Sequence, residues 1–151
     1  MRRQERELSH SEVLTILEKG EYGVLSMCTP AKEGYGVPLN YAFNNTDIYF
    51  HCAKEGSKLD YLRNNPNVSF CVVGKTTVLP SSFGTLYESA IATGTTSEVE
   101  GTEKLKALKL FIEKYSGEFI PEGNEYITKL LERVSVIKLK VKSVTGKARK
   151  Q

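Results

Sequence analysis

The sequence lacks any apolar run long enough to cross a bilayer, and its charged start, MRRQERELSH, leads into no apolar segment. A spanning helix needs roughly 20 apolar residues, and a secretory signal needs an apolar stretch behind its basic start. We therefore expect a cytoplasmic protein with no membrane partner. Cysteine is scarce too. Cys28, Cys52 and Cys71 are odd in number and widely spaced, which favours free thiols in a reducing compartment over disulfides.

Histidine is scarcer still, since the chain holds only His10 and His51. Neither has a second histidine or a cysteine at the spacing of a zinc ligand set, so we expect no metal site. Excess charge of one sign is also missing. The net charge is only +3, and the basic residues gather at the two ends of the chain. Such ends are typical of solvated termini, so we expect no nucleic-acid partner.

The composition predicts one soluble globular domain with a hydrophobic core, because 40% of the 151 residues are apolar and 26% are charged. A first helix is indicated by Ser9 and Glu12, which fit a capping box ahead of an apolar face. Gly20 is expected to end this helix as its C′ residue. Apolar periodicity predicts two more helices, over 102–115 and 124–131.

Short apolar or alternating runs between turn signals predict six strands. Polar turns separate the first three, which predicts an antiparallel meander. Gly74 and Gly94 lie inside two of the longer strands and mark candidate bulges, and long strands of this kind commonly curl into a barrel. Strands and helices do not alternate regularly, and no G-x-G-x-x-G follows a strand, so we expect an α+β, mainly β fold rather than a Rossmann fold. The predicted strands cover 22–29, 35–43, 48–52, 67–79, 85–100 and 137–142.

The segment Ile48–Pro66, IYFHCAKEGSKLDYLRNNP, carries the strongest functional signal. It predicts an apolar strand, a polar loop and a helix over Ser57–Asn64 that ends because a proline follows. A helix N-terminus offers unpaired N–H groups and a partial positive charge. Ser57 and Lys58 add a hydroxyl and an ammonium there. We therefore expect a bound anion, such as the phosphate of a cofactor, beside His51.

Each of these residues also has a purely structural explanation. Lys58 could be a solvated lysine, although a cation in the first turn opposes the helix dipole unless an anion is bound. Ser57 could simply cap the helix, and a histidine at a strand end is commonly structural. Pro38 cannot donate to a β-ladder, so it marks an edge or a bulge where a flat ring could pack.

Four segments together resemble the flavin-binding split barrels related to pyridoxamine 5′-phosphate oxidase, and among them the nitroimidazole-resistance subgroup most closely. The resemblance implies a six-stranded antiparallel split β-barrel with flanking helices, with residues 1–151 forming a single FMN-binding domain. It also implies a homodimer with FMN at the subunit interface. The four segments are GVPLNYAF (36–43), IYFHCAKEGSKLDYLRNNPNVSFCVVG (48–74), YESAIATGTTSEVE (87–100) and TGKARK (145–150).

For function, the resemblance implies an FMN-dependent oxidoreductase that acts on a small-molecule substrate, such as a nitroaromatic compound of the 5-nitroimidazole type. The alternatives are a non-catalytic flavin- or small-ligand-binding protein and a haem-binding split barrel. The arginine and histidine with which the true oxidases bind substrate near their C-terminus have no match in TGKARKQ. Oxidation of pyridoxamine phosphate is therefore not expected.

The same resemblance assigns the candidate site residues. The phosphate would lie against Lys54, Ser57 and Lys58, where Ser57 replaces an arginine that the oxidases often carry. His51 would lie beside the flavin as the candidate catalytic group. The remaining candidates for cofactor contacts are Val37, Pro38, Leu39 and Asn40 along the ring, and Tyr87, Glu88, Ser89 and Lys147 from segments that a partner subunit could supply.

Overall fold

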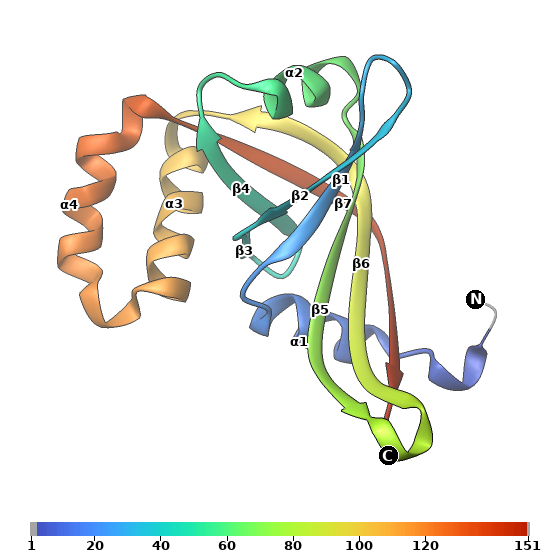
Figure 1. Cartoon of the computed structure of the whole chain (residues 1–151). Coiled ribbons are helices and arrows are strands. Elements are labelled where there is room, and N and C mark those ends of the chain that lie inside the picture. The colour runs from blue at the N-terminus through green and yellow to red at the C-terminus, as the bar shows by residue number, and fades with distance from the viewer. Residues whose placement is uncertain (1–2, 151) are drawn as a thin grey trace.

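A computed structural model describes residues 3–150, so the first two residues and the last residue of the predicted domain lie outside it. Seven strands form one antiparallel sheet in the order β2-β1-β5-β6-β7-β4-β3, with helices packed around it (Figure 1). The predicted mainly β fold with flanking helices is confirmed. The strands are β1 (Gly23–Cys28), β2 (Gly34–Leu39), β3 (Ala42–Phe43), β4 (Asp47–Ala53), β5 (Asn67–Leu79), β6 (Gly84–Val99) and β7 (Val134–Arg149).

The α-helices are α1 (His10–Lys19), α2 (Ser57–Asn64), α3 (Gly101–Tyr115) and α4 (Ile120–Leu130). Short 3-10 turns flank some of them. The predicted bounds are confirmed for α2, while α4 begins four residues earlier than predicted and β7 continues past the predicted 142 to Arg149. No helix within 3–150 is long and apolar enough to span a membrane.

The strand count differs from the predicted six because the run 35–43 is two strands. β2 and β3 are separated by only Asn40 and Tyr41, yet they lie at opposite ends of the strand order. The sheet must therefore curl until its two ends approach each other. No ladder joins β2 to β3 within the described residues, so the curled sheet is not closed and the six-stranded barrel is not confirmed in that detail.

Both antiparallel pairings of the predicted meander are present, since β1 pairs with β2 and β3 pairs with β4. The two pairs lie at opposite ends of the sheet, however, because the predicted second strand is broken at Asn40 and Tyr41. The cause is Tyr41, whose side chain is fully buried and whose hydroxyl donates to the Leu17 carbonyl at 2.5 Å. Its backbone N–H donates to the Tyr115 hydroxyl rather than to a neighbouring strand. A tyrosine turned into the core in this way interrupts the strand.

The capping box at the start of α1 is confirmed, since Ser9 N–H donates to Glu12 at 2.9 Å and Glu12 N–H donates back to the Ser9 hydroxyl. Gly20 ends α1 as predicted, but as its C-cap and not as a left-handed C′ residue. Its φ is −64°, outside the left-handed region that a C′ glycine adopts. A Cβ at Gly20 would instead collide with the Val72 side chain and lie 2.6 Å from the Tyr41 hydroxyl. Glycine is needed there for close approach.

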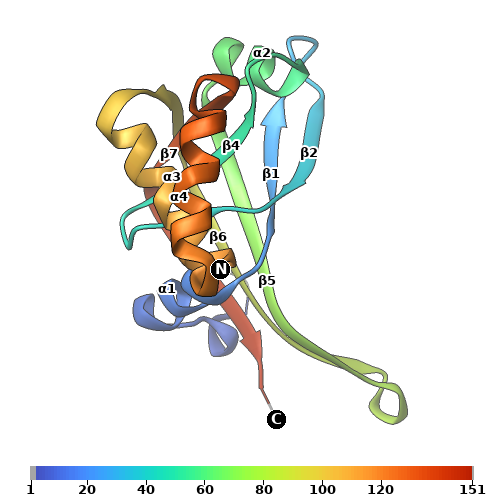
Figure 2. The ribbon, with the colours of Figure 1, turned by 90° about the vertical axis from the view of Figure 1, so that its left-hand side faces the viewer.

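The two predicted bulges are confirmed. The β5–β6 register shifts between Val73 and Thr76, on either side of Gly74, and the β6–β7 register shifts at Gly94. A Cβ at Gly94 would collide with the Lys140 carbonyl oxygen. Bulges bend strands, and Figure 2 shows the β5–β6 hairpin extending well beyond the body of the molecule.

The core has two parts, which share β4 and β7. One fills the interior of the curled sheet around Phe50 and Phe70, and Leu59 and Leu62 of α2 close one end of it. The other lies between the sheet and the α3–α4 pair, around Tyr49, Phe111 and Ile127. Because β4 contributes to both, its C-terminal end is held firmly where α2 begins.

Candidate functional site

The N-terminus of α2 is open. Gly56 precedes the helix with a φ of +137°, a conformation that favours glycine, and a Cβ there would meet nothing within 4 Å. Gly56 is therefore the N-cap, and Ser57 is the first helical residue rather than the cap that one interpretation of the sequence proposed. No described side chain caps this end. Its first N–H groups are thus available to a ligand.

Lys58 lies in the first turn of α2 and is half-buried. Within residues 3–150 it forms no ion pair with a carboxylate. The positive charge of Lys58 also acts on Cys52, near the end of β4. Burial raises the pKa of the Cys52 thiol, and Lys58 opposes that rise. An ammonium without a carboxylate, beside open helix N–H groups, is a suitable site for an anion.

Arg63, one helical turn and a half further along α2, also opposes the pKa rise of Cys52, and the sequence analysis did not single it out. Its guanidinium is already paired with Glu98, with Nε at 2.7 Å and Nη2 at 3.2 Å. That long-range pair has no local sequence signal. It leaves Lys58, together with the exposed Lys54 of the preceding loop, as the cations free for a ligand at this end of α2 among the described residues.

His51 lies on β4 and keeps contact with solvent, although its ring packs edge-on against Phe111 with centroids 4.7 Å apart. Burial against this neighbour lowers the pKa of His51, and the Lys58 charge lowers it further. The imidazole is therefore neutral near pH 7. In that state it can both donate and accept a hydrogen bond, as a group beside a flat polar ligand would need to do.

The strand β2 is one edge of the sheet, which confirms the prediction from Pro38. Pro38 is exposed and pairs with Val24 of β1, while Val37 and Leu39 are partly buried and Asn40 follows the strand. Tyr35 of β2 packs edge-on against Tyr61 of α2, with ring centroids 5.3 Å apart. The candidate ring strand and the candidate phosphate helix are therefore held together.

The second group of candidates lies elsewhere in the same chain. Ser89 of β6 pairs with Lys147 of β7, with Tyr87 and Glu88 beside them. His51 pairs with Val136 of β7, which pairs with Val99 of β6, ten residues beyond Ser89. Ten strand residues extend roughly 33 Å along the strand. His51 and Lys58 thus lie together near the end of β4, whereas Ser89 and Lys147 lie about ten residues away along the strands β6 and β7.

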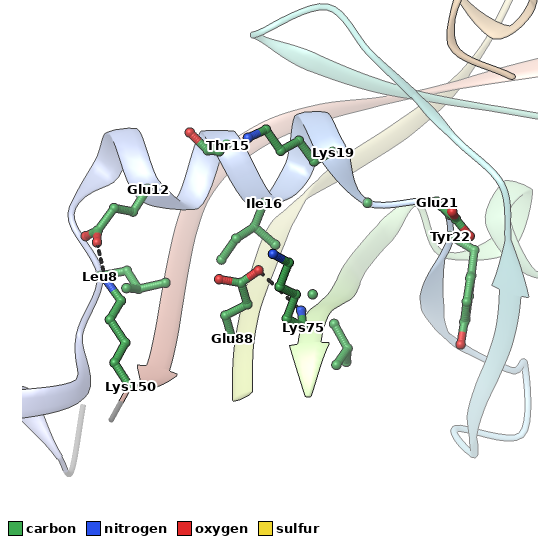
Figure 3. A pocket seen from close by; sticks show the side chains of 13 residues that line it. Leu8, Glu12, Thr15, Ile16, Lys19, Glu21, Tyr22, Lys75, Glu88 and Lys150 are labelled. Carbon is green, nitrogen blue, oxygen red and sulfur yellow. Dashed lines mark hydrogen bonds and ion pairs between the residues drawn. The ribbon is translucent and has the colours of Figure 1, made fainter. Parts of the chain in front are cut away.

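Glu88 has a structural partner of its own. Its carboxylate accepts the Lys75 backbone N–H at 3.2 Å, and a Cβ on Gly74 would lie 2.5 Å from the same oxygen. Figure 3 shows this contact inside a groove of about 690 Å³ between α1 and the β5–β6 hairpin, which is bounded at one end by the Glu12–Lys150 pair at 2.7 Å. None of the residues lining this groove belongs to the His51–Lys58 group. This groove is therefore separate from the His51–Lys58 group, although the candidate residue Glu88 lines it.

Within the described residues, no cluster of three or more histidine, cysteine or acidic side chains could hold a metal ion. The chemistry available at the site is thus anion binding at α2, hydrogen bonding by a neutral imidazole and packing against a strand edge.

Comparison with known proteins gives this geometry a family. No curated protein matches the chain. Among solved structures, a "putative 5-nitroimidazole antibiotic resistance protein" from Bacteroides thetaiotaomicron is 22% identical with a TM-score of 0.77, covering 94% of this chain and 86% of its own. A FAD-binding protein from Mesorhizobium loti is 21% identical with a TM-score of 0.68, covering 96% and 98%.

The FAD and heme binding protein from Mycobacterium smegmatis is 16% identical with a TM-score of 0.72, covering 95% of this chain and 72% of its own. At such identities these structures establish the fold alone. The family model described as pyridoxamine 5′-phosphate oxidase matches residues 9–148, nearly the whole chain. The protein therefore belongs to the pyridoxamine 5′-phosphate oxidase family, as the four sequence segments predicted.

Proposed function

We propose that this protein binds a flavin, FMN, and works as an FMN-dependent oxidoreductase on small molecules such as nitroaromatic compounds. The observation that carries the proposal is the uncapped N-terminus of α2, where Lys58 lies beside His51 and has no carboxylate partner among the described residues. Membership of the family and the FAD-binding protein among the similar structures support a flavin as the ligand.

The residues at α2 fit a terminal phosphate. A phosphate monoester carries between one and two negative charges near neutral pH and accepts several hydrogen bonds. The open N–H groups and the Ser57 hydroxyl would donate to it, while Lys58 and Lys54 would balance its charge. FMN ends in such a group, whereas both phosphates of FAD are internal. This difference favours FMN over FAD.

The free edge of β2 fits the flavin ring. Pro38 has no N–H to leave unpaired beneath a ring, and the flanking residues Val37, Leu39 and Asn40 would offer apolar surface and backbone polar groups. His51 would hydrogen-bond at the ring edge. A phosphate that neutralises Lys58 would raise the pKa of His51 and help it to hold a proton. The flavin would supply the electron transfer.

We further propose that the site is completed in a homodimer. Ser89, Lys147 and Tyr87 lie about ten strand residues from the level of His51 along β6 and β7, and a second copy would provide them to the flavin. Glu88 is the weakest member of this group, because its carboxylate already serves the bulge at Lys75.

The test begins with the purified protein soaked with FMN, desalted and examined for a flavin absorbance spectrum, with the bound flavin extracted and identified as FMN or FAD. Lys58→Ala should lose most of the flavin and Lys58→Arg should keep it. Lys129→Ala, an exposed lysine of α4, is the matched control. A colourless parent protein after soaking would refute flavin binding. Extraction of FAD alone would refute the choice of FMN.

Turnover needs a separate measurement. The reduced, FMN-loaded protein is mixed anaerobically with a 5-nitroimidazole, and both flavin reoxidation and loss of the nitro compound are followed. Stoichiometric loss over repeated cycles supports the oxidoreductase. The competing function is a flavin-binding protein without turnover, which is favoured by the absence of a second histidine near His51. Flavin that binds and never consumes the substrate would establish it, and a haem spectrum after loading with haem would indicate the third alternative.

A further inference from the structure

The end of α3 is tied to the break between β2 and β3 by a single hydroxyl. Tyr115, the last residue of α3, accepts the Tyr41 backbone N–H at 3.1 Å. Its own proton can go to the Glu21 carbonyl at 2.6 Å or to the Tyr41 carbonyl at 2.9 Å. A hydroxyl has one proton and two acceptor sites, so these contacts use nearly its whole hydrogen-bonding capacity.

No ladder satisfies the backbone of this segment. β2 ends at Leu39 and β3 begins at Ala42, so the N–H and C=O groups of Tyr41 lie outside both registers. Buried backbone polar groups need partners. The Tyr115 hydroxyl accepts the Tyr41 N–H, and it donates to the Tyr41 carbonyl when its proton does not go to Glu21. The neighbouring Asn40 is bound to the Glu21 carbonyl, which also accepts from Tyr115, because the Asn40 side-chain amide donates to it at 2.9 Å.

The Tyr41 side chain is fixed separately. Its hydroxyl donates to Leu17, its ring packs edge-on against Phe70 with centroids 4.9 Å apart, and the Lys114 ammonium lies 3.6 Å from the ring centroid. The side chain would therefore stay in the core if the Tyr115 hydroxyl were removed. What the hydroxyl controls is the direction of the backbone on either side of Tyr41.

That direction matters because Asn40 and the end of β2 come immediately before it. We propose that Tyr115 is a positioning residue for the flavin ring, which acts by holding the Asn40–Tyr41 break so that the free edge of β2 keeps the orientation the ring requires. The proposal rests on the function proposed above. The residue it adds, Tyr115, lies 74 positions from Tyr41 in the sequence and is not one of the candidate phosphate-binding residues.

The variant that isolates the hydroxyl is Tyr115→Phe, because it keeps the ring that stacks beside Phe111 with centroids 6.1 Å apart. The control is Tyr126→Phe, which removes a hydroxyl from an exposed tyrosine of α4. Riboflavin, which has the ring without the phosphate, is the probe of the ring site, and inorganic phosphate is the probe of the α2 site.

Tyr115→Phe should weaken riboflavin binding roughly tenfold, the change expected for one lost hydrogen bond. It should leave phosphate affinity unchanged, shift the visible spectrum of bound FMN and speed amide hydrogen exchange at Tyr41. The control should match the parent in all four. A merely structural role would lower the melting temperature and leave riboflavin affinity at 25 °C unaltered, which would overturn the proposal.

The two proposals fail differently. If the parent protein binds both FMN and riboflavin and Tyr115→Phe binds riboflavin equally well, the positioning role is wrong and the proposed function stands. If the parent protein binds neither flavin, the proposed function fails, and the positioning role fails with it.

Discussion

Two regions of the molecule differ in how their charged groups are partnered. The first, which we term the anchor end, comprises His51–Lys58 and the adjoining edge Val37–Asn40. Lys58 is half-buried and forms no ion pair with a carboxylate within residues 3–150, and Leu59 and Leu62 hold α2 against the core. A helix held firmly by the core, with a positive charge that forms no ion pair among the described residues, is suited to binding an anion.

The second region, the arm end, comprises the hairpin residues Val73–Ser89 with Lys147–Lys150. Here some charged groups have partners, since Lys150 pairs with Glu12 of α1 and the Glu88 carboxylate accepts the Lys75 backbone N–H. Two apolar side chains at the tip of this hairpin are not packed against the rest of the chain, since Val78 is 69% exposed and Phe83 is 98% exposed. The anchor end therefore presents a positive charge suited to an anion, whereas the tip of the hairpin presents exposed apolar side chains, which fit the homodimer proposed above.

The largest effect is expected when the anchor end is mutated in one chain and the arm end in another. Lys58→Ala and Lys147→Glu chains should each fail to hold FMN alone, yet a mixed dimer should contain one intact site, formed by Lys58 of one chain and Lys147 of the other. Flavin occupancy after mixing, measured on the dimer fraction by sedimentation with absorbance detection, checks this. Mixtures that stay colourless, or a parent protein that sediments as a monomer, would show that the arm end takes no part.

Glu88 tests the claim that arm-end charges are structural. Removing its carboxylate by Glu88→Ala leaves the Lys75 N–H without its acceptor, so the free energy of unfolding should fall by about 1–2 kcal/mol. FMN affinity of the folded protein should not change. Urea unfolding and FMN titration of the same variant provide both values. A large loss of FMN affinity with intact stability would instead make Glu88 a cofactor ligand.

Lys114, like Lys58, forms no ion pair with a carboxylate among the described residues. Its ammonium is buried against Tyr41 with no hydrogen bond among the described residues, and burial lowers its pKa to about 8. Between about pH 8 and 10.5 the unfolded chain holds this proton and the folded chain does not, so stability should rise with pH across that window.

Lys114→Met should therefore abolish this rise and stabilise the protein at pH 7 by about 1 kcal/mol, the desolvation cost being partly offset by the lost cation–π contact. FMN binding should be unaffected, since the ammonium faces an aromatic ring rather than a helix end. Thermal unfolding at pH 7 and pH 10 measures the effect. A variant that is less stable at pH 7 would show that the contact with Tyr41 outweighs burial.

His51 gives the smallest expected effect. Burial and the Lys58 charge both lower its pKa, so Lys58→Met should move that pKa part of the way back towards its ordinary value. Inorganic phosphate should do the same in the parent. Because the folded-state pKa is lowered, His51 costs stability as the pH falls below its unfolded pKa, and Lys58→Met should reduce that loss. An NMR titration of the imidazole tests both, and a pKa indifferent to phosphate would separate His51 from the anion site.

Local signals made most of this fold predictable. The bounds of α2 follow from Gly56 and the proline after it, the start of α1 from its capping box, and the bulges from Gly74 and Gly94. His51, Lys54, Ser57 and Lys58 were predictable for the same reason, because one short segment carries them.

The remainder depends on contacts between residues far apart in the chain. The break at Tyr41 is held by Tyr115, whose place in the apolar face of a helix predicts a core residue rather than a hydrogen-bonding one. The partner of Glu88 arises only when a bulge turns the Lys75 N–H towards it. The separation of Ser89 from His51 depends on strand order, which the sequence does not show.

The central claim is that Lys58 and the open end of α2 bind the phosphate of a flavin. The most direct measurement compares FMN with riboflavin by fluorescence titration in the parent protein and in Lys58→Ala. The parent should bind FMN at least tenfold more tightly than riboflavin, as expected for charge-assisted hydrogen bonds to one phosphate. Lys58→Ala should bind the two almost equally. An undiminished preference for FMN in Lys58→Ala would contradict the account.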